Sequence, residues 1–221
     1  THLIEVSKGG FSIGLVSGYS GTGKSALVQE AFKTLARTNG YFLAGKFDQL
    51  QRNIPYYAVR QAFREYFKYL LSEEGKLIDA TRRRILEALG SDAGLITEII
   101  PELEHIIGKQ PEQQKSTGLA GQNQFNYTFI KFLKAITDKE RPVVVFLDDL
   151  QWADLASLNL INNIILEQQF EYLLLIGSYR DNEVNETHPL NQLIKDAEKA
   201  GITLNHLKVK NLVQNIDIAP T

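Results

Sequence analysis

One eight-residue stretch constrains the fold more than any other part of the chain. Residues 18–25 read Gly-Tyr-Ser-Gly-Thr-Gly-Lys-Ser and match the P-loop pattern G-x-x-x-x-G-K-[ST]. An apolar stretch over residues 11–17 precedes the loop, and apolar residues at helical spacing follow it. A strand, a glycine loop and a helix in this order create an anion site, because loop N–H groups and the helix N-terminus converge on phosphate oxygens. The alternative, a glycine-rich turn that binds nothing, does not explain these flanks.

The loop residues have separate expected roles in binding a nucleotide. Lys24 is expected to reach the β- and γ-phosphates, and the Ser25 hydroxyl to ligate Mg²⁺. The residues expected to surround the phosphates are Gly18, Tyr19, Ser20, Gly21, Thr22, Gly23, Lys24, Ser25 and Ala26. A nucleoside di- or triphosphate and Mg²⁺ are therefore the expected ligands.

The composition is that of an ordinary globular protein. The 221 residues suffice for one large domain or two small ones, and a net charge of −2 gives no general attraction to nucleic acid or an anionic membrane. No apolar run approaches the ~20 residues that span a bilayer, and the N-terminus lacks a signal-peptide pattern. Cysteine is absent, which excludes disulfides and leads us to expect a cytoplasmic protein. Methionine is absent even at position 1, so we expect a fragment of a longer chain.

Strands and helices are expected to alternate along most of the chain. The predicted strands cover residues 11–17, 41–47, 142–149, 172–179 and 202–209. Predicted helices follow the P-loop to about residue 38 and cover residues 55–70, 76–89, 93–100, 125–136, 155–165 and 189–200. Residues 1–8 are expected to end a helix, residues 108–121 to form a surface loop, and no element is expected after residue 210. This alternation predicts a parallel α/β sheet with right-handed crossovers.

The predicted fold class is therefore an α/β P-loop NTPase, and because the predicted strand over residues 41–47 lies between the P-loop unit and the third predicted strand, we expect the AAA/ASCE type. Helices are expected to flank a five-stranded parallel sheet, and residues 55–140 to form a helical insert between the second and third strands. We expect a single domain over residues 1–221.

The second anchor of the predicted site is the end of the third strand. Residues 143–147 are five consecutive apolar residues, three of them valine, as expected for a strand buried on both faces. Asp148 and Asp149 follow. Asp148 matches the Walker B acid that holds Mg²⁺, and Asp149 is expected to orient or deprotonate the attacking water. The alternative is a solvated Asp-Asp turn, which the presence of a P-loop disfavours.

The strand pattern favours ATP as the nucleotide. In the chain, a predicted strand (residues 41–47) lies between the P-loop unit and the Asp148 strand, an arrangement typical of AAA-type ATPases, and we find no N-K-x-D or T-K-x-D guanine motif.

Arg180 ends the fourth predicted strand, where its guanidinium is expected to sense or stabilise charge near the γ-phosphate. The alternative for Arg180 is an ion pair with Asp181 or Glu183. Arg52, in the loop after the second strand, is a weaker candidate.

Three segments together resemble one protein family. Besides the P-loop, they are Gly-Lys-Phe-Asp-Gln at residues 45–49, Phe-Leu-Asp-Asp-Leu-Gln-Trp-Ala-Asp at residues 146–154 and Gly-Ser-Tyr-Arg-Asp-Asn-Glu-Val at residues 177–184. Over nearly the whole chain, the sequence resembles the AAA-like ATPase module of the STAND class, which occurs in multidomain sensor kinases. The resemblance implies an ATP-dependent switch in which Asp148 binds Mg²⁺ and Arg180 senses phosphate. The 45–49 segment receives no catalytic role.

Two departures from the family pattern are expected. The upstream motif that contacts adenine in the family is expected to lie before Thr1, and the helical lid and winged-helix segment are expected to lie beyond residue 211, outside this sequence. The resemblance implies kinase and sensor domains of a parent chain as partners, and a homo-oligomer as a further option.

Three functions remain open from the sequence. The favoured one is a regulatory ATPase. The second is a nucleotide-dependent scaffold without catalysis, supported by Asp149 at a position where many hydrolytic relatives have Glu. The third is a small-molecule kinase that uses the helical insert as its acceptor site. A nucleic-acid ATPase is disfavoured by the charge of −2.

Overall fold

The fold is built on one five-stranded parallel sheet. In the computed structural model, residues 9–32, 40–111 and 118–210 are described. The strands are β1 (Phe11–Ser17), β2 (Tyr41–Lys46), β3 (Val143–Asp148), β4 (Leu173–Tyr179) and β5 (Asn205–Lys208). They lie in the order β2-β3-β4-β1-β5, and every pair is parallel. The sheet confirms the predicted α/β fold class, and the predicted outer strand is the edge strand β5.

The position of β2 corrects part of the argument from strand order. We took the strand over residues 41–47 as the one that distinguishes this class, but β2 lies at an edge of the sheet. The strand that separates β1 from β3 is β4. Because all strands are parallel, the ends of β1, β3 and β4 reach the same edge, with Ser17 opposite Tyr179 and Leu147 opposite Gly177.

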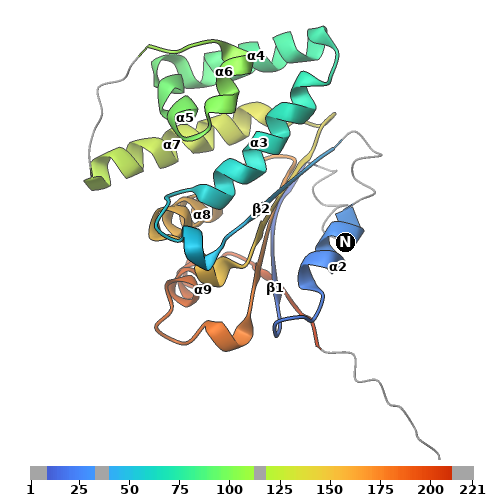
Figure 1. The fold of residues 1–221 in the computed structure, drawn as a ribbon, viewed down its shortest axis with the longest axis vertical. Coiled ribbons are helices and arrows are strands. Elements are labelled where there is room, and N and C mark those ends of the chain that lie inside the picture. The colour runs from blue at the N-terminus through green and yellow to red at the C-terminus, as the bar shows by residue number, and fades with distance from the viewer. Residues whose placement is uncertain (1–8, 33–39, 112–117, 211–221) are drawn as a thin grey trace, which may run out of the picture.

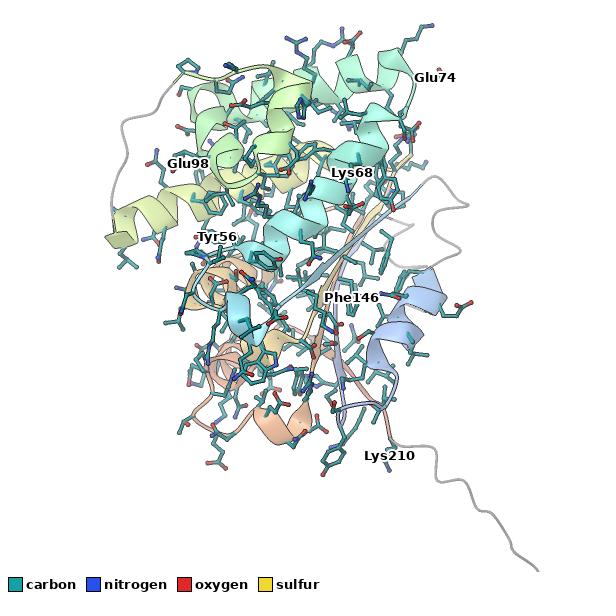
Figure 2. The ribbon with its side chains drawn as sticks, viewed as in Figure 1. Tyr56, Lys68, Glu74, Glu98, Phe146 and Lys210 are labelled. Atoms are coloured by element: carbon teal, nitrogen blue, oxygen red, sulfur yellow. The ribbon has the colours of Figure 1, made fainter. Side chains whose placement is uncertain are left out.

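Helices cover both faces of the sheet (Figure 1). Helix α2 (Lys24–Phe32) lies on one face, and α3 (Tyr57–Leu71), α8 (Leu155–Glu167) and α9 (Pro189–Lys199) lie on the other. Val28 and Phe32 of α2 pack on a separate apolar cluster that includes Phe146. Figure 2 shows Phe146 between the sheet and α2. The larger apolar core lies on the opposite face, as expected for a sheet whose inner strand β3 is buried at all six positions.

A helical layer lies between β2 and β3 in the chain. After α3 it contains α4 (Gly75–Leu89), α5 (Ala93–Ile99), α6 (Glu104–Ile107) and α7 (Gly118–Ile136). Aromatic side chains join its helices, because Phe63 of α3 packs against Phe129 and Phe132 of α7 at centroid distances of 5.1 and 5.6 Å. This layer is the predicted helical insert, and it joins the core that covers the sheet.

Two boundaries in this layer were predicted wrongly. The stretch 108–121 was assigned to a loop because of its proline, glutamine and glycine residues, but residues 118–121 form the first turn of α7. The helix following Pro55 begins only at Tyr57, because Tyr56 adopts a left-handed conformation (φ 62°). The Tyr56 ring is buried against Phe125 at 4.4 Å, and its hydroxyl donates to Asn126 Oδ1 at 3.3 Å. Tertiary packing of Tyr56 therefore overrides the helix-start signal of Pro55.

Other predictions fall partly outside the described residues. The helix expected over residues 1–8, the end of the P-loop helix near residue 38 and the chain after residue 210 belong to this group. Strand β5 is shorter than the predicted 202–209. The extent of the domain, residues 1–221, stays a prediction. Within the described ranges, we find no helix both long and apolar enough to cross a bilayer.

Candidate nucleotide-binding site

The P-loop connects β1 to α2 through a backbone that requires glycine. Gly21 and Gly23 have φ angles of 77° and 81°, which side chains disfavour. Gly18 has a different constraint, because a Cβ there would lie 2.3 Å from the carbonyl oxygen of Val209. The loop is closed by the Thr22 hydroxyl, which donates to the Tyr19 carbonyl at 2.9 Å. The predicted strand, loop and helix are therefore all present.

Lys24 lies inside this loop rather than on the surface. Its side-chain ammonium donates to the carbonyl oxygens of Gly18 at 2.9 Å and Tyr19 at 2.8 Å, and the residue is only 7% exposed. Burial lowers the pKa of Lys24, and Arg180 acts in the same direction while Asp149 and Asp148 oppose it. These charges therefore act on one another within a single site.

Ser25 and Asp148 are the point at which the two sequence motifs meet. The Ser25 hydroxyl donates to Asp148 Oδ2 at 2.6 Å, across 123 positions of sequence. The other oxygen, Asp148 Oδ1, accepts from the Ser178 hydroxyl and from the Asp149 N–H. Mg²⁺ takes oxygen ligands and commonly needs only one or two from the protein, with phosphate and water completing its shell. The paired hydroxyl and carboxylate fit that ion.

Asp149 is buried between cationic groups. Its Oδ2 lies 3.2 Å from Lys46 Nζ, and its Oδ1 lies 3.4 Å from Arg180 Nε and accepts from Gln151 Nε2 at 2.9 Å. Burial alone would raise the pKa of Asp149, but the hydrogen bonds from Gln151 and Lys46 and the charges of Lys46 and Arg180 bring it below its ordinary value. These contacts therefore favour the ionised form of the Asp149 carboxylate.

Arg180 borders the site and also forms the ion pair named as its alternative. Its Nη1 lies 2.7 Å from Glu183 Oε1, while its Nε faces Asp149. Asp181, the other suggested partner, pairs instead with Lys208 at 2.7 Å. Arg52 is exposed in the loop after β2. The structure therefore brings Arg180, Asp149 and Lys24 within electrostatic range of one another.

The sequence argument missed three residues of this site: Lys46, Gln151 and Ser178. Lys46 ends β2 directly opposite Asp148, and Ser178 lies near the end of β4 beside β3. Two sequence signals could have found these residues. Lys46 and Ser178 lie near the carboxyl ends of predicted strands, where parallel α/β proteins bind ligands. Gln151 follows Asp149 by two residues.

Known proteins share this sequence pattern. A model of the AAA ATPase domain family matches residues 1–176. The chain is 37% identical over 161 residues to hybrid signal transduction histidine kinase G of Dictyostelium discoideum, and 29% identical over 168 residues to the peroxide stress-activated histidine kinase mak2 of Schizosaccharomyces pombe. The matches cover 73% and 68% of this chain but only 5% and 7% of those two proteins.

Proposed function

The chain belongs to the AAA ATPase domain family, and on this premise we propose that it is a Mg²⁺-dependent ATPase that regulates a larger signalling protein. Both relatives described above are histidine kinases, and the chain corresponds to a small part of each. We propose kinase and sensor domains of a parent chain as its partners, in the cytoplasm. A homo-oligomer is a further option, and we expect neither nucleic acid nor membrane as a partner.

The observation that carries this proposal is the contact of Ser25 with Asp148. It places a hydroxyl and a carboxylate together at the start of α2, next to the P-loop glycines. In our proposal, Ser25 and Asp148 hold Mg²⁺, which when bound neutralises phosphate charge. Lys24 binds the β- and γ-phosphates from inside the loop.

In the same proposal, Asp149 acts on the attacking water and Arg180 on the transferred phosphate. Asp149 orients the attacking water, since its carboxylate is buried and held in place by several donors. Arg180 stabilises charge at the γ-phosphate. Because a carboxylate of lowered pKa is a weak base, we expect slow turnover.

Calorimetric titration and phosphate release test the proposal together. The wild-type chain should bind ATP and ADP in Mg²⁺ more tightly than GTP and release phosphate slowly. Lys24→Ala should lose binding, and Asp149→Asn should bind ATP but lose turnover. Equal inertness of all three proteins in phosphate release refutes hydrolysis by this chain. Trp152, the single tryptophan, lies in the turn after Asp149 and offers a fluorescence signal of binding.

The contacts of Asp149 also favour a second candidate, a nucleotide-dependent scaffold without catalysis. Lys46 and Arg180 both neutralise this carboxylate, which would suit a site that binds nucleotide and keeps it. Binding of ATP with distinct conformations in ATP and ADP, and with no phosphate release, would favour the scaffold over the ATPase.

A further inference from the structure

We propose that Gln151 is a positioning residue that sets the Asp149 carboxylate and the Arg180 main chain relative to each other. The inference rests on the proposed nucleotide site. It assigns a task to a buried residue that neither the P-loop nor the two carboxylates account for.

The amide of Gln151 bridges both groups. Its Nε2 donates to Asp149 Oδ1 at 2.9 Å, and its Oε1 accepts from the Arg180 N–H at 3.2 Å. The orientation of the amide follows from its partners, because a carboxylate oxygen accepts and a main-chain N–H donates. Gln151 is 2% exposed, so water does not compete freely for either bond.

The turn that carries Gln151 is fixed on two sides. It begins at Asp149, which has a left-handed backbone (φ 57°), and it is closed by the Trp152 N–H donating to the Asp149 carbonyl at 2.9 Å. Leu150 packs against β4 so closely that a Cβ at Gly177 would lie 2.3 Å from its Cδ1. The turn therefore rests directly on the strand that leads to Arg180.

A histidine at the N-cap of α9 holds the main chain of Gln151. His188 Nδ1 accepts from the Leu190 N–H at 3.1 Å, so this nitrogen carries no proton in the neutral ring. The ring proton is then on Nε2, which lies 3.2 Å from the Gln151 carbonyl oxygen and donates to it. Both ends of Gln151 are thus anchored, which is what a positioning residue needs.

Loss of the amide should release Arg180 toward its competing partner. Without Gln151 Oε1, the Arg180 N–H loses its acceptor. Without Gln151 Nε2, Asp149 Oδ1 keeps only the longer contact to Arg180 Nε, whereas Glu183 holds the guanidinium at 2.7 Å. A guanidinium drawn to Glu183 contributes less to recognition of a γ-phosphate.

The test compares two Gln151 variants with the wild type. Calorimetry gives the affinities for ATP and ADP, and phosphate release gives kcat and KM. Gln151→Leu removes both bonds and should reduce the preference for ATP over ADP and kcat by about tenfold or more each. Gln151→Glu keeps the acceptor for the Arg180 N–H but loses the donor to Asp149. It should keep most of the ATP preference while lowering kcat with little change in KM.

Two controls separate positioning from general loss of stability. Ser157→Ala, in α8, removes a fully buried hydroxyl that donates to Asp154 at the N-cap of that helix, and it should leave the ATP preference unchanged. In an Arg180→Ala background, Gln151→Leu should cause no further loss of ATP preference, because both changes act on one group.

The outcomes decide the inference separately from the ATPase proposal. If Gln151→Leu behaves like Ser157→Ala in both the ATP preference and kcat, the positioning role is refuted. If the wild type binds nucleotide but does not hydrolyse ATP, hydrolysis fails and the ATP preference alone decides the role of Gln151. A wild-type chain that binds neither nucleotide refutes both.

Discussion

The contact between strand β2 and helix α3 leaves no space for a side chain at Gly45. A Cβ at this position would lie 1.9 Å from the Ala58 carbonyl oxygen and 2.7 Å from its carbonyl carbon. Carbon atoms in favourable contact lie ~3.5–4.0 Å apart. Because the obstacle is main chain, no rotamer change can relieve it. In Gly45→Ala, the strand and the helix must separate by roughly 1 Å or more.

This separation should cost a large part of the stability. Overpacking a well-packed core costs ~1–3 kcal/mol, and a main-chain obstacle places Gly45→Ala at the upper end, about 3 kcal/mol. For a chain of 221 residues, each 1 kcal/mol lowers Tm by ~2–4 °C, so Tm should fall by roughly 6–12 °C. Lys46, which contacts Asp149, is the next residue, so nucleotide affinity should fall as well.

Gly75→Ala is the matched control. Gly75 is the first residue of α4, and a Cβ there would meet no atom within 4 Å. The same chemical change should therefore raise stability by ~0.4–1 kcal/mol, by restricting the unfolded chain. Urea unfolding followed by circular dichroism measures both variants. If Gly45→Ala unfolds within about 0.5 kcal/mol of the wild type, a magnitude usual for surface substitutions, the described packing of β2 on α3 is wrong.

Three further predictions address the core, pH and Mg²⁺. Phe129→Ala removes a ring that is 1% exposed and should lower the free energy of unfolding by ~3–5 kcal/mol, measured in urea. Burial raises the pKa of Tyr56 from 10.0 to about 12, so its contribution to stability is complete below pH 10 and is lost as the pH rises toward 12. Tyr56→Phe should therefore lose less stability than the wild type across that window; an equal loss contradicts the assignment. Ser25→Ala should bind ATP with an affinity that depends less on Mg²⁺, and calorimetry with and without EDTA would show unchanged dependence if Ser25 is not a ligand.

The sheet was predictable because the apolar pattern of its strands reflects how deeply they are buried. Strand β3 is buried on both faces, so its pattern is a continuous apolar run, and the P-loop fixes where β1 ends. The start of α7 was not predictable from local signals, because the glycines of residues 118–121 mark a loop by propensity. At the start of α3, by contrast, long-range packing decides the boundary, because the Tyr56 ring is buried against Phe125.

Some contacts of the candidate site could likewise be predicted from the sequence, and others could not. The meeting of Ser25 with Asp148 was expected, because in this fold the first and third strands end at one edge of the sheet. The contacts of Lys46 and Gln151 depend on which strands are neighbours and on how one short turn is bent. The sequence therefore named Asp149 and Arg180, but not Lys46 and Gln151, which also hold the Asp149 carboxylate.

Those groups change what Asp149 can do in the proposed reaction. From the sequence, Asp149 was expected either to orient the attacking water or to deprotonate it, and both roles stayed open. Lys46, Gln151 and Arg180 stabilise its ionised form, which keeps it ready to accept a hydrogen bond from water but lowers its affinity for a proton. Orientation of water is therefore the better supported role. In the proposed ATPase we therefore expect slow turnover, which would let a bound ATP persist long enough to act as a signal.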